Sequence, residues 1–325
     1  MDRRQALITA CAVTLAALHA PRPAHAQDYP SRPITIVVPF SPGGATDVVA
    51  RTIAEKLAQR LGKPVVVENR PGGGGAIAND YVRQRPADGY TLYAVATPFS
   101  TAPITNPAVH KYDPTVDFTP IVRTSEMVTV IAVSAALPVN SVSELIAWAR
   151  ANPGALNVAT TGIGSSDHLL PIRIEQVAGV KFNYVHYKGS TQGVQDLLSG
   201  TVQMKYDALS SVRAHIESGR LKALALATER PSPIMPNLPT LQQTLPGVFT
   251  RTYTGLLGPA GMKPEVVALL NREVNALLQQ PDVRARLGNL GLEPVENSPQ
   301  EFSAYLKAHM QFQQDTVKRA GIVLE

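Results

Sequence analysis

Two glycine-containing segments of the chain have the composition of anion-binding loops. The first, SPGGATD, covers residues 41–47, and the second, TTGIGSSDH, covers residues 160–168; each follows an apolar run and leads into a helix-forming stretch. The free backbone N–H groups and the positive end of a helix N-terminus attract anions. A carboxylate is therefore a candidate ligand for both segments. For the first segment, a tight turn that binds nothing is the alternative.

The glycines of these segments do not form a nucleotide-binding motif. A phosphate-binding loop places a lysine after its glycines, and no lysine follows Gly43 and Gly44. A dinucleotide loop reads GxGxxG, and in GGGGAIA at 72–78 Ile77 occupies the last glycine position. The chemistry left for the first segment is that of the backbone N–H groups of Gly43 and Gly44 beside a helix start.

The second segment adds side-chain hydrogen-bond donors to the same arrangement. Its hydroxyl groups are those of Thr160, Thr161, Ser165 and Ser166, and Gly162 and Gly164 let a ligand approach the backbone. If both helix N-termini face one crevice, they can hold an anion from two sides. Lys188, in the later segment YKG, is either a solvated loop charge or an attraction for acidic ligands.

The sequence gives little support for a catalytic site. Ser165, His168 and Asp207 could be imagined as a triad, but Gly-x-Ser-x-Gly is absent, and Ser166 and His168 fall in the first turn of one helix. We therefore interpret His168 as a polar residue at a helix start. Asp47 stands at the start of its helix, where a negative charge interacts favourably with the helix dipole, so we interpret its role as structural.

The histidines and the cysteine give no metal or redox site. His186 and His215 lack metal-ligand spacing with each other or with a carboxylate. Cys11 is the only cysteine and lies in the N-terminal segment, so the rest of the chain has neither disulfides nor a thiol nucleophile. We predict no catalytic residue, no metal and no cofactor.

The first 26 residues read as a secretory signal peptide. Arg3 and Arg4 precede an apolar run, and Ala24-His25-Ala26 forms a small-x-small cleavage site before Gln27. The chain of 325 residues carries a net charge of +5; the signal holds three arginines and one aspartate, which leaves +3 for residues 27–325. This diffuse charge and the 6% of aromatic residues favour an acidic small ligand over nucleic acid.

Strands alternate with helices along the remaining chain. Strands are expected over 34–39, 65–67 and 90–96, and again over 128–133, 156–160, 182–185, 202–206 and 223–228. Helices are expected over 47–61 with Thr46 as N-cap, over 141–151 with Ser141 and Glu144 as a capping box, and over 76–85, 167–178, 191–198, 264–280 and 298–319. The alternation predicts an α/β fold with mainly parallel sheets flanked by helices. Residues 27–124 and 252–325 would form one domain, and 125–251 a second, inserted domain, with the ligand cleft between them.

Several segments together resemble a known family. They are YPSRPITIVVPFSPGGATDVVAR, GKPVVVENRPGGGG, ADGYTL, NPGALNVATTGIGSSDHL, HYKGS, DLLSG and GLLGPAG with PEVVALLN, in this order over nearly the whole chain after the signal. In these segments the chain resembles the Bug-type receptors, periplasmic solute-binding proteins of tripartite tricarboxylate transporters. The resemblance implies a two-lobed, type II-like Venus-flytrap fold, a small carboxylate ligand, and two integral membrane subunits, one small and one large, as partners.

The resemblance also implies the ligand-binding residues. In the first loop they are Phe40, Ser41, Gly43, Gly44, Ala45, Thr46 and Asp47. In the second lobe they are Thr160, Thr161, Gly162, Ser165, Ser166 and His168, then Tyr187, Lys188 and Gly189, and the strand-end aspartate Asp207. Thr97, after the strand over 90–96, completes the predicted set. Three residues depart from the family pattern: His186 replaces a usual proline, Ala208 a usual asparagine, and Tyr253 a usual tryptophan.

The expected function is a periplasmic receptor that closes over a small organic carboxylate as a monomer and catalyses no reaction. A ligand sensor that feeds a signalling protein is an alternative, and a hydrolase of a small ester or amide is another. The sequence leaves the identity of the carboxylate open, and the low aromatic content favours an aliphatic acid.

Overall fold

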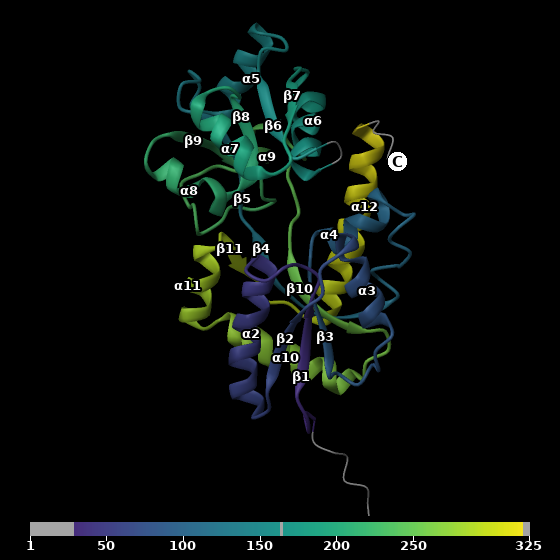
Figure 1. Cartoon of the computed structure of the whole chain (residues 1–325). Helices are drawn as coiled ribbons and strands as arrows, with labels where there is room; N and C mark the ends of the chain where they lie inside the picture. The colour runs from purple at the N-terminus through teal and green to yellow at the C-terminus, as the bar shows by residue number, and fades with distance from the viewer. Residues whose placement is uncertain (1–28, 163–164, 321–325) are drawn as a thin grey trace, which may run out of the picture.

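Two β-sheets organise the part of the chain that the computed structural model describes, residues 29–162 and 165–320. The lower lobe in Figure 1 contains a six-stranded sheet in the order β11-β4-β10-β3-β1-β2, and the upper lobe a five-stranded sheet in the order β7-β6-β8-β5-β9. The signal peptide predicted over residues 1–26 lies outside the described residues.

The first lobe takes its strands from both ends of the chain. They are β1 (Ile34–Val38), β2 (Val65–Asn69), β3 (Thr91–Ala96), β4 (Phe118–Met127), β10 (Thr254–Pro259) and β11 (Leu292–Pro294). The helices are α2 (Ala45–Leu61), the short 3₁₀ helix η1 (Gly73–Gly75), α3 (Ala76–Arg83), α4 (Pro98–Thr105), α10 (Pro264–Leu278), α11 (Pro281–Asn289) and α12 (Pro299–Ala320). Apolar residues of α2 at helical spacing, Val49, Ile53 and Leu57, are buried in the core that covers β1.

The second lobe is built from one continuous stretch. Its strands are β5 (Thr129–Ser134), β6 (Asn157–Thr160), β7 (Asn183–His186), β8 (Met204–Ala208) and β9 (Leu221–Leu226). Its helices are α5 (Val142–Ala151), α6 (Ser166–Ala178), α7 (Ser190–Ser199), α8 (Leu209–Glu217) and α9 (Leu241–Thr244). As predicted, Ser141 caps α5 by accepting a hydrogen bond from the Glu144 backbone N–H at 3.1 Å.

Each sheet has a hydrophobic core on both faces. In the second lobe, Ile131 and Val133 of β5 face one core, and Val130 and Ala132 face the other. Burial on both faces explains why the central strands read as continuous apolar runs.

The sheets are mixed, and the prediction of mainly parallel pairing is wrong in this respect. β1 pairs in parallel with β2 and β3, and β6 with β7 and β8, whereas β10 runs antiparallel to β3 and β4, and β5 antiparallel to β8 and β9. The antiparallel pairs involve the strands through which the chain leaves the first lobe and returns to it. Because β4 leads away and β10 leads back, the two neighbours run in opposite directions.

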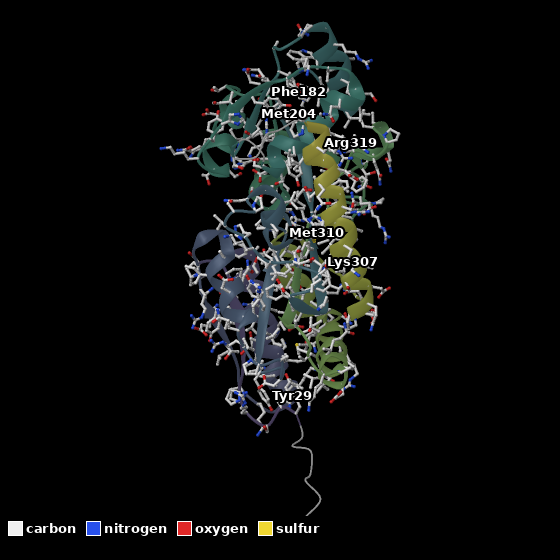
Figure 2. All side chains as sticks on the ribbon, turned by 90° about the vertical axis from the view of Figure 1, so that its right-hand side faces the viewer. Tyr29, Phe182, Met204, Lys307, Met310 and Arg319 are labelled. Atoms are coloured by element: carbon white, nitrogen blue, oxygen red, sulfur yellow. The ribbon has the colours of Figure 1, made fainter. Side chains whose placement is uncertain are left out.

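Helix α12 adds a further connection to the two chain crossings between the lobes. Figure 1 shows it rising from the first lobe to the side of α6, and in Figure 2 Lys307 lies at the level of the first lobe and Arg319 beside the second. At its upper end Gln176 of α6 donates a hydrogen bond to the Arg319 carbonyl at 2.7 Å. The C-terminal helix therefore reaches the space between the lobes.

Within residues 29–162 and 165–320, none of the helices combines the length and the apolar character that crossing a membrane requires.

Candidate ligand-binding cleft

A cavity of about 330 Å³ lies between the lobes. The first lobe contributes Ala45, Thr46, Ala96 and Thr97, and the crossing segments contribute residues from 249 to 254. The second lobe contributes the N-terminal half of α6 and the end of β8, and α12 contributes Phe312, Gln313 and Thr316. The N-termini of α2 and α6 therefore approach one cavity from opposite lobes, as the two glycine segments predict.

The first loop is held together by Asp47. Its carboxylate accepts hydrogen bonds from the Gly43 backbone N–H at 2.9 Å and from the Asn69 amide at 2.8 Å, and it pairs with Arg51 at 2.9 Å. The same Asn69 amide donates to the Phe40 carbonyl at 3.0 Å. Burial alone would raise the pKa of Asp47, but the bonds from Arg51, Gly43 and Asn69 outweigh it and lower that pKa. The buried carboxylate thus fixes the shape of the loop.

The start of α2 differs from the prediction. The helix begins at Ala45, and Gly44 is its N-cap without a side-chain cap bond, so the prediction that Thr46 caps the helix is wrong. Thr46 lies inside the first turn, where its side chain lines the cavity. Of the two glycines in this loop, Gly43 has a positive φ of 90°, whereas Gly44 has φ −74°.

The second loop is held together by Asp167, which sequence reasoning did not select. Its carboxylate accepts hydrogen bonds from Thr161 Oγ1 at 2.9 Å and from Ser165 Oγ. The Thr160 side chain is buried and shares a hydrogen bond with His186. The hydroxyls of Thr160, Thr161 and Ser165 therefore hold the loop, and Thr161 and Ser166 line the cavity.

A buried lysine joins this loop to the next one. Lys205 is 1% exposed, and its Nζ lies 3.2 Å from Asp167 Oδ2 and 3.5 Å from Asp207 Oδ2. Asp207 in turn accepts a hydrogen bond from Ser190, the residue after YKG. Sequence reasoning missed Lys205 and Ser190. The spacing of two between Lys205 and Asp207 in a strand was the available signal, because such residues share a face.

The remaining predicted residues of the second lobe are not among the residues that line the cavity. Tyr187 donates a hydrogen bond to Asp196 at 2.6 Å, and burial, followed by that carboxylate, raises the pKa of Tyr187 to about 12. Lys188 is exposed, and neither it nor Gly189 is among the cavity-lining residues. His168 is buried with its ring 5.3 Å from that of His186, and burial, followed by the charge of His186, lowers its pKa.

Of the predicted set, the structure brings six residues to the cavity and leaves the others outside its lining. The six are Ala45, Thr46, Thr97, Thr161, Ser166 and Asp207. The others are Phe40, Ser41, Gly43, Gly44, Asp47, Thr160, Gly162, Ser165, His168, Tyr187, Lys188 and Gly189. Of the three departures from the family pattern, Ala208 and Tyr253 line the cavity and His186 does not.

Two arginines and several apolar side chains in the lining were also missed. Arg251 pairs with both oxygens of Glu229, at 2.9 and 3.0 Å. Arg173, on α6, packs its guanidinium 4.6 Å from the Phe312 ring centre, and Phe312 stacks on Phe249 at 5.1 Å. These contacts join α6, α12 and a crossing segment. They depend on tertiary docking, which local sequence patterns do not report.

The arrangement is suited to binding. Ser165, the hydroxyl of the imagined triad, has the Asp167 carboxylate and the Gly162 carbonyl within hydrogen-bonding distance as acceptors for its one proton. Asp207 is engaged by Lys205 and Ser190. In the described part of the chain, no group of three histidine, cysteine, aspartate or glutamate side chains is placed to hold a metal ion.

Sequence relatives of the chain are bacterial. Residues 49–325 match the family described as the tripartite tricarboxylate transporter family receptor, TctC. Protein BugT of Bordetella pertussis is 33% identical over 322 residues, which cover 98% of each chain. The UPF0065 protein of the tcbD-tcbE intergenic region of Pseudomonas sp. (strain P51) is 36% identical over 282 residues, 86% of this chain and 84% of the relative.

Solved structures of the same family share the fold. A TctC solute-binding protein from Polaromonas superposes with a TM-score of 0.81 at 30% identity and covers 90% of this chain and 99% of its own. An R. palustris protein solved with adipate has a TM-score of 0.74 at 35% identity and covers 91% of this chain and 99% of its own. MatC from Rhodopseudomonas palustris, solved with malate, has a TM-score of 0.69 at 31% identity and covers 89% of this chain and 100% of its own. The chain therefore belongs to the tripartite tricarboxylate transporter receptor family, the Bug or TctC family of periplasmic solute-binding receptors.

Proposed function

We propose that the protein binds one small organic carboxylate in the cavity between its lobes. The observation that carries the proposal is the meeting of two helix N-termini, at Ala45 and Ser166, on one cavity from opposite lobes. Backbone N–H groups there donate to an anion, and both helix dipoles favour negative charge. The hydroxyls of Thr46, Thr97 and Ser166, which also line the cavity, supply side-chain hydrogen bonds.

The predicted residues outside the lining act by holding these loops in place. Asp47 and Ser165 make the internal bonds of the two loops, and Gly43 supplies the left-handed backbone of the first turn. We propose that two domains move relative to each other. Residues 27–124 and 252–325 together form one of them, and residues 125–251 form the other. A ligand that touches both of them binds the closed arrangement more tightly, and this difference drives closure.

The ligand class is supported by two relatives, which were solved with adipate and malate. The family description supports delivery of the bound carboxylate to a tripartite transporter. One small and one large integral membrane subunit are the partners that we propose. In this role the protein works in the periplasm as a monomer, and it releases its ligand chemically unchanged.

The first test is native mass spectrometry of the protein purified from a periplasmic extract, followed by calorimetric titration with the acid that co-purifies. We expect one carboxylate per chain and no turnover of its esters or amides. Turnover without stable carboxylate binding would favour the hydrolase instead. Protein that binds no carboxylate at all would contradict the proposal.

The second test separates transport from signalling. Deleting the gene should abolish uptake of the radiolabelled carboxylate by whole cells, and a plasmid copy should restore it. Unchanged uptake together with a lost transcriptional response to the carboxylate would favour the sensor.

A further inference from the structure

One face of α6 forms a long wall of the cavity. Ser166, at the helix start, and Arg173, seven residues later, both line the cavity, with Leu169 and Leu170 between them. Seven residues are about two helical turns, so the two positions share a face and lie about 10 Å apart along the axis. The Cα–Cβ bond of Arg173 tilts toward the N-terminus of α6, the end at which Ser166 lies, and its guanidinium lies against Phe312.

Arg173 brings a positive charge that the protein itself does not neutralise. Its guanidinium donates to the carbonyl oxygens of Gly247 and Phe249. Among residues 29–162 and 165–320, no carboxylate lies within ion-pair distance of Arg173, whereas Arg251 in the same lining is paired with Glu229. A guanidinium has five N–H donors, so Arg173 keeps donors for a further acceptor.

The surface between the two ends of this wall is apolar. Leu169 and Leu170 of α6 line it, and Phe249 and Phe312 flank the guanidinium. Apolar walls disfavour water around an unpaired charge, which makes a ligand carboxylate a stronger partner for Arg173 than it would be on the surface.

We propose that Arg173 binds a second carboxylate of the ligand, so that the protein selects an α,ω-dicarboxylate with several methylene groups between its ends. This assignment rests on the proposed function, which places the first carboxylate at the helix N-termini near Ala45 and Ser166. The methylene chain lies along Leu169 and Leu170. Arg173 is thus a specificity-determining residue.

The test compares adipate with hexanoate, which share a carbon count and differ in one carboxylate. Calorimetric titration of the wild-type protein should show tighter binding of adipate. In Arg173→Gln, adipate affinity should fall about 10- to 100-fold, while hexanoate affinity changes less than about twofold. Arg173→Lys should retain part of the preference, because it keeps the charge but loses the bidentate geometry.

Arg150→Gln is the matched control. Arg150 lies in the same lobe, also donates to a main-chain carbonyl, that of Ala178 at 2.7 Å, and is absent from the cavity lining. Arg150→Gln should leave both affinities unchanged. If Arg173→Gln lowered the affinities for adipate and hexanoate equally, Arg173 would only hold residues 247–249 in place, and the proposed subsite would be wrong. An Arg173→Gln variant with unchanged affinity for both acids would also overturn the subsite. Adipate and hexanoate belong to the series of straight-chain dicarboxylates and monocarboxylates. If the wild-type protein bound no member of either series, the proposed function would be contradicted, and the subsite with it.

Discussion

The loop over residues 41–47 and the loop over residues 160–166 follow the same pattern of strand, glycine and helix start, yet different anchors hold them. In the first, Asp47 pairs with Arg51, whose side chain is 47% exposed. In the second, Asp167 pairs with Lys205, whose side chain is 1% exposed and also reaches Asp207. The first anchor serves its own loop, whereas the second connects two segments of the cavity wall.

Exposure decides how much each anchor contributes. A charge pair that water reaches contributes little to stability, because solvation competes with the attraction. A buried cation between two carboxylates leaves both of them uncompensated when it is removed. We therefore expect the second lobe to depend on one residue, Lys205, and the first lobe to distribute its dependence over Arg51, Asn69 and the Gly43 backbone.

The largest effect is expected for Lys205→Met, which keeps the length of the side chain and removes the charge. Asp167 and Asp207 would then face each other in the cavity wall without a cation, and the free energy of unfolding should fall by about 3–5 kcal/mol. Urea denaturation followed by circular dichroism measures this loss.

The matched control is Arg51→Met, which removes the cation of the first loop. It should lower the free energy of unfolding by less than about 1 kcal/mol, because water reaches the Arg51 side chain and because Gly43 and Asn69 still donate to the Asp47 carboxylate. Equal losses in the two variants would contradict the difference between the anchors.

A smaller effect is expected for Asp47→Asn. The substitution removes the negative charge to which Arg51, Gly43 and Asn69 donate hydrogen bonds. Because such bonds are charge-assisted, the free energy of unfolding should fall by about 1.5–3 kcal/mol. Because the folded pKa of Asp47 is lowered, its contribution is complete above the ordinary value of 3.8 and is lost as pH falls through the lowered pKa.

Unfolding experiments between pH 7 and pH 3 check this prediction. The difference in stability between wild type and Asp47→Asn should narrow toward the acid end. A constant difference would show that Asp47 acts through packing and not through its charge.

Glycine substitutions test the shape of the first loop. Gly43→Ala places a Cβ on a residue with φ 90°, which should cost about 1–2 kcal/mol, although nothing obstructs the added atom. Gly44→Ala makes the same chemical change at φ −74°, where the nearest atom is 3.9 Å from the Cβ, and should be nearly neutral in thermal unfolding. Equal effects would mean that the loop relaxes around either substitution.

Much of the fold follows from local patterns. The apolar spacing that predicts a helix over 47–61 corresponds to α2, and the capping box at Ser141 corresponds to the start of α5. β4 was not predicted, because its sequence FTPIVRTSEM interrupts the apolar run with Pro120, Arg123 and Glu126. That strand lies beside the junction of the lobes, where polar residues replace a continuous core.

The cavity was only partly predictable for a related reason. Residues next to the glycines, such as Thr46 and Ser166, are marked by the loop pattern itself. Phe312 and Arg173 reach the cavity only because α12 docks against α6. The spacing of apolar residues predicts that α12 is a helix, but it does not indicate which distant element that helix contacts.

The smallest effects are expected for the single hydroxyls that each loop presents to the cavity. Ser166→Ala and Thr46→Val each remove one hydrogen-bonding group from the cavity lining. Each should weaken carboxylate binding by about 1 kcal/mol, which is several-fold in affinity. Thr46→Val preserves the shape of the side chain, and Ser166 is exposed, so folding should be unaffected in both variants. The two hydroxyls come from different lobes but share one ligand carboxylate, so the double variant should lose less or more than the sum of the two single losses. Calorimetric titration with the co-purified acid measures all three. If Ser166→Ala weakened binding and Thr46→Val did not, the first loop would bind through its backbone alone, and the two lobes would differ in their ligand contacts as well as in their anchors.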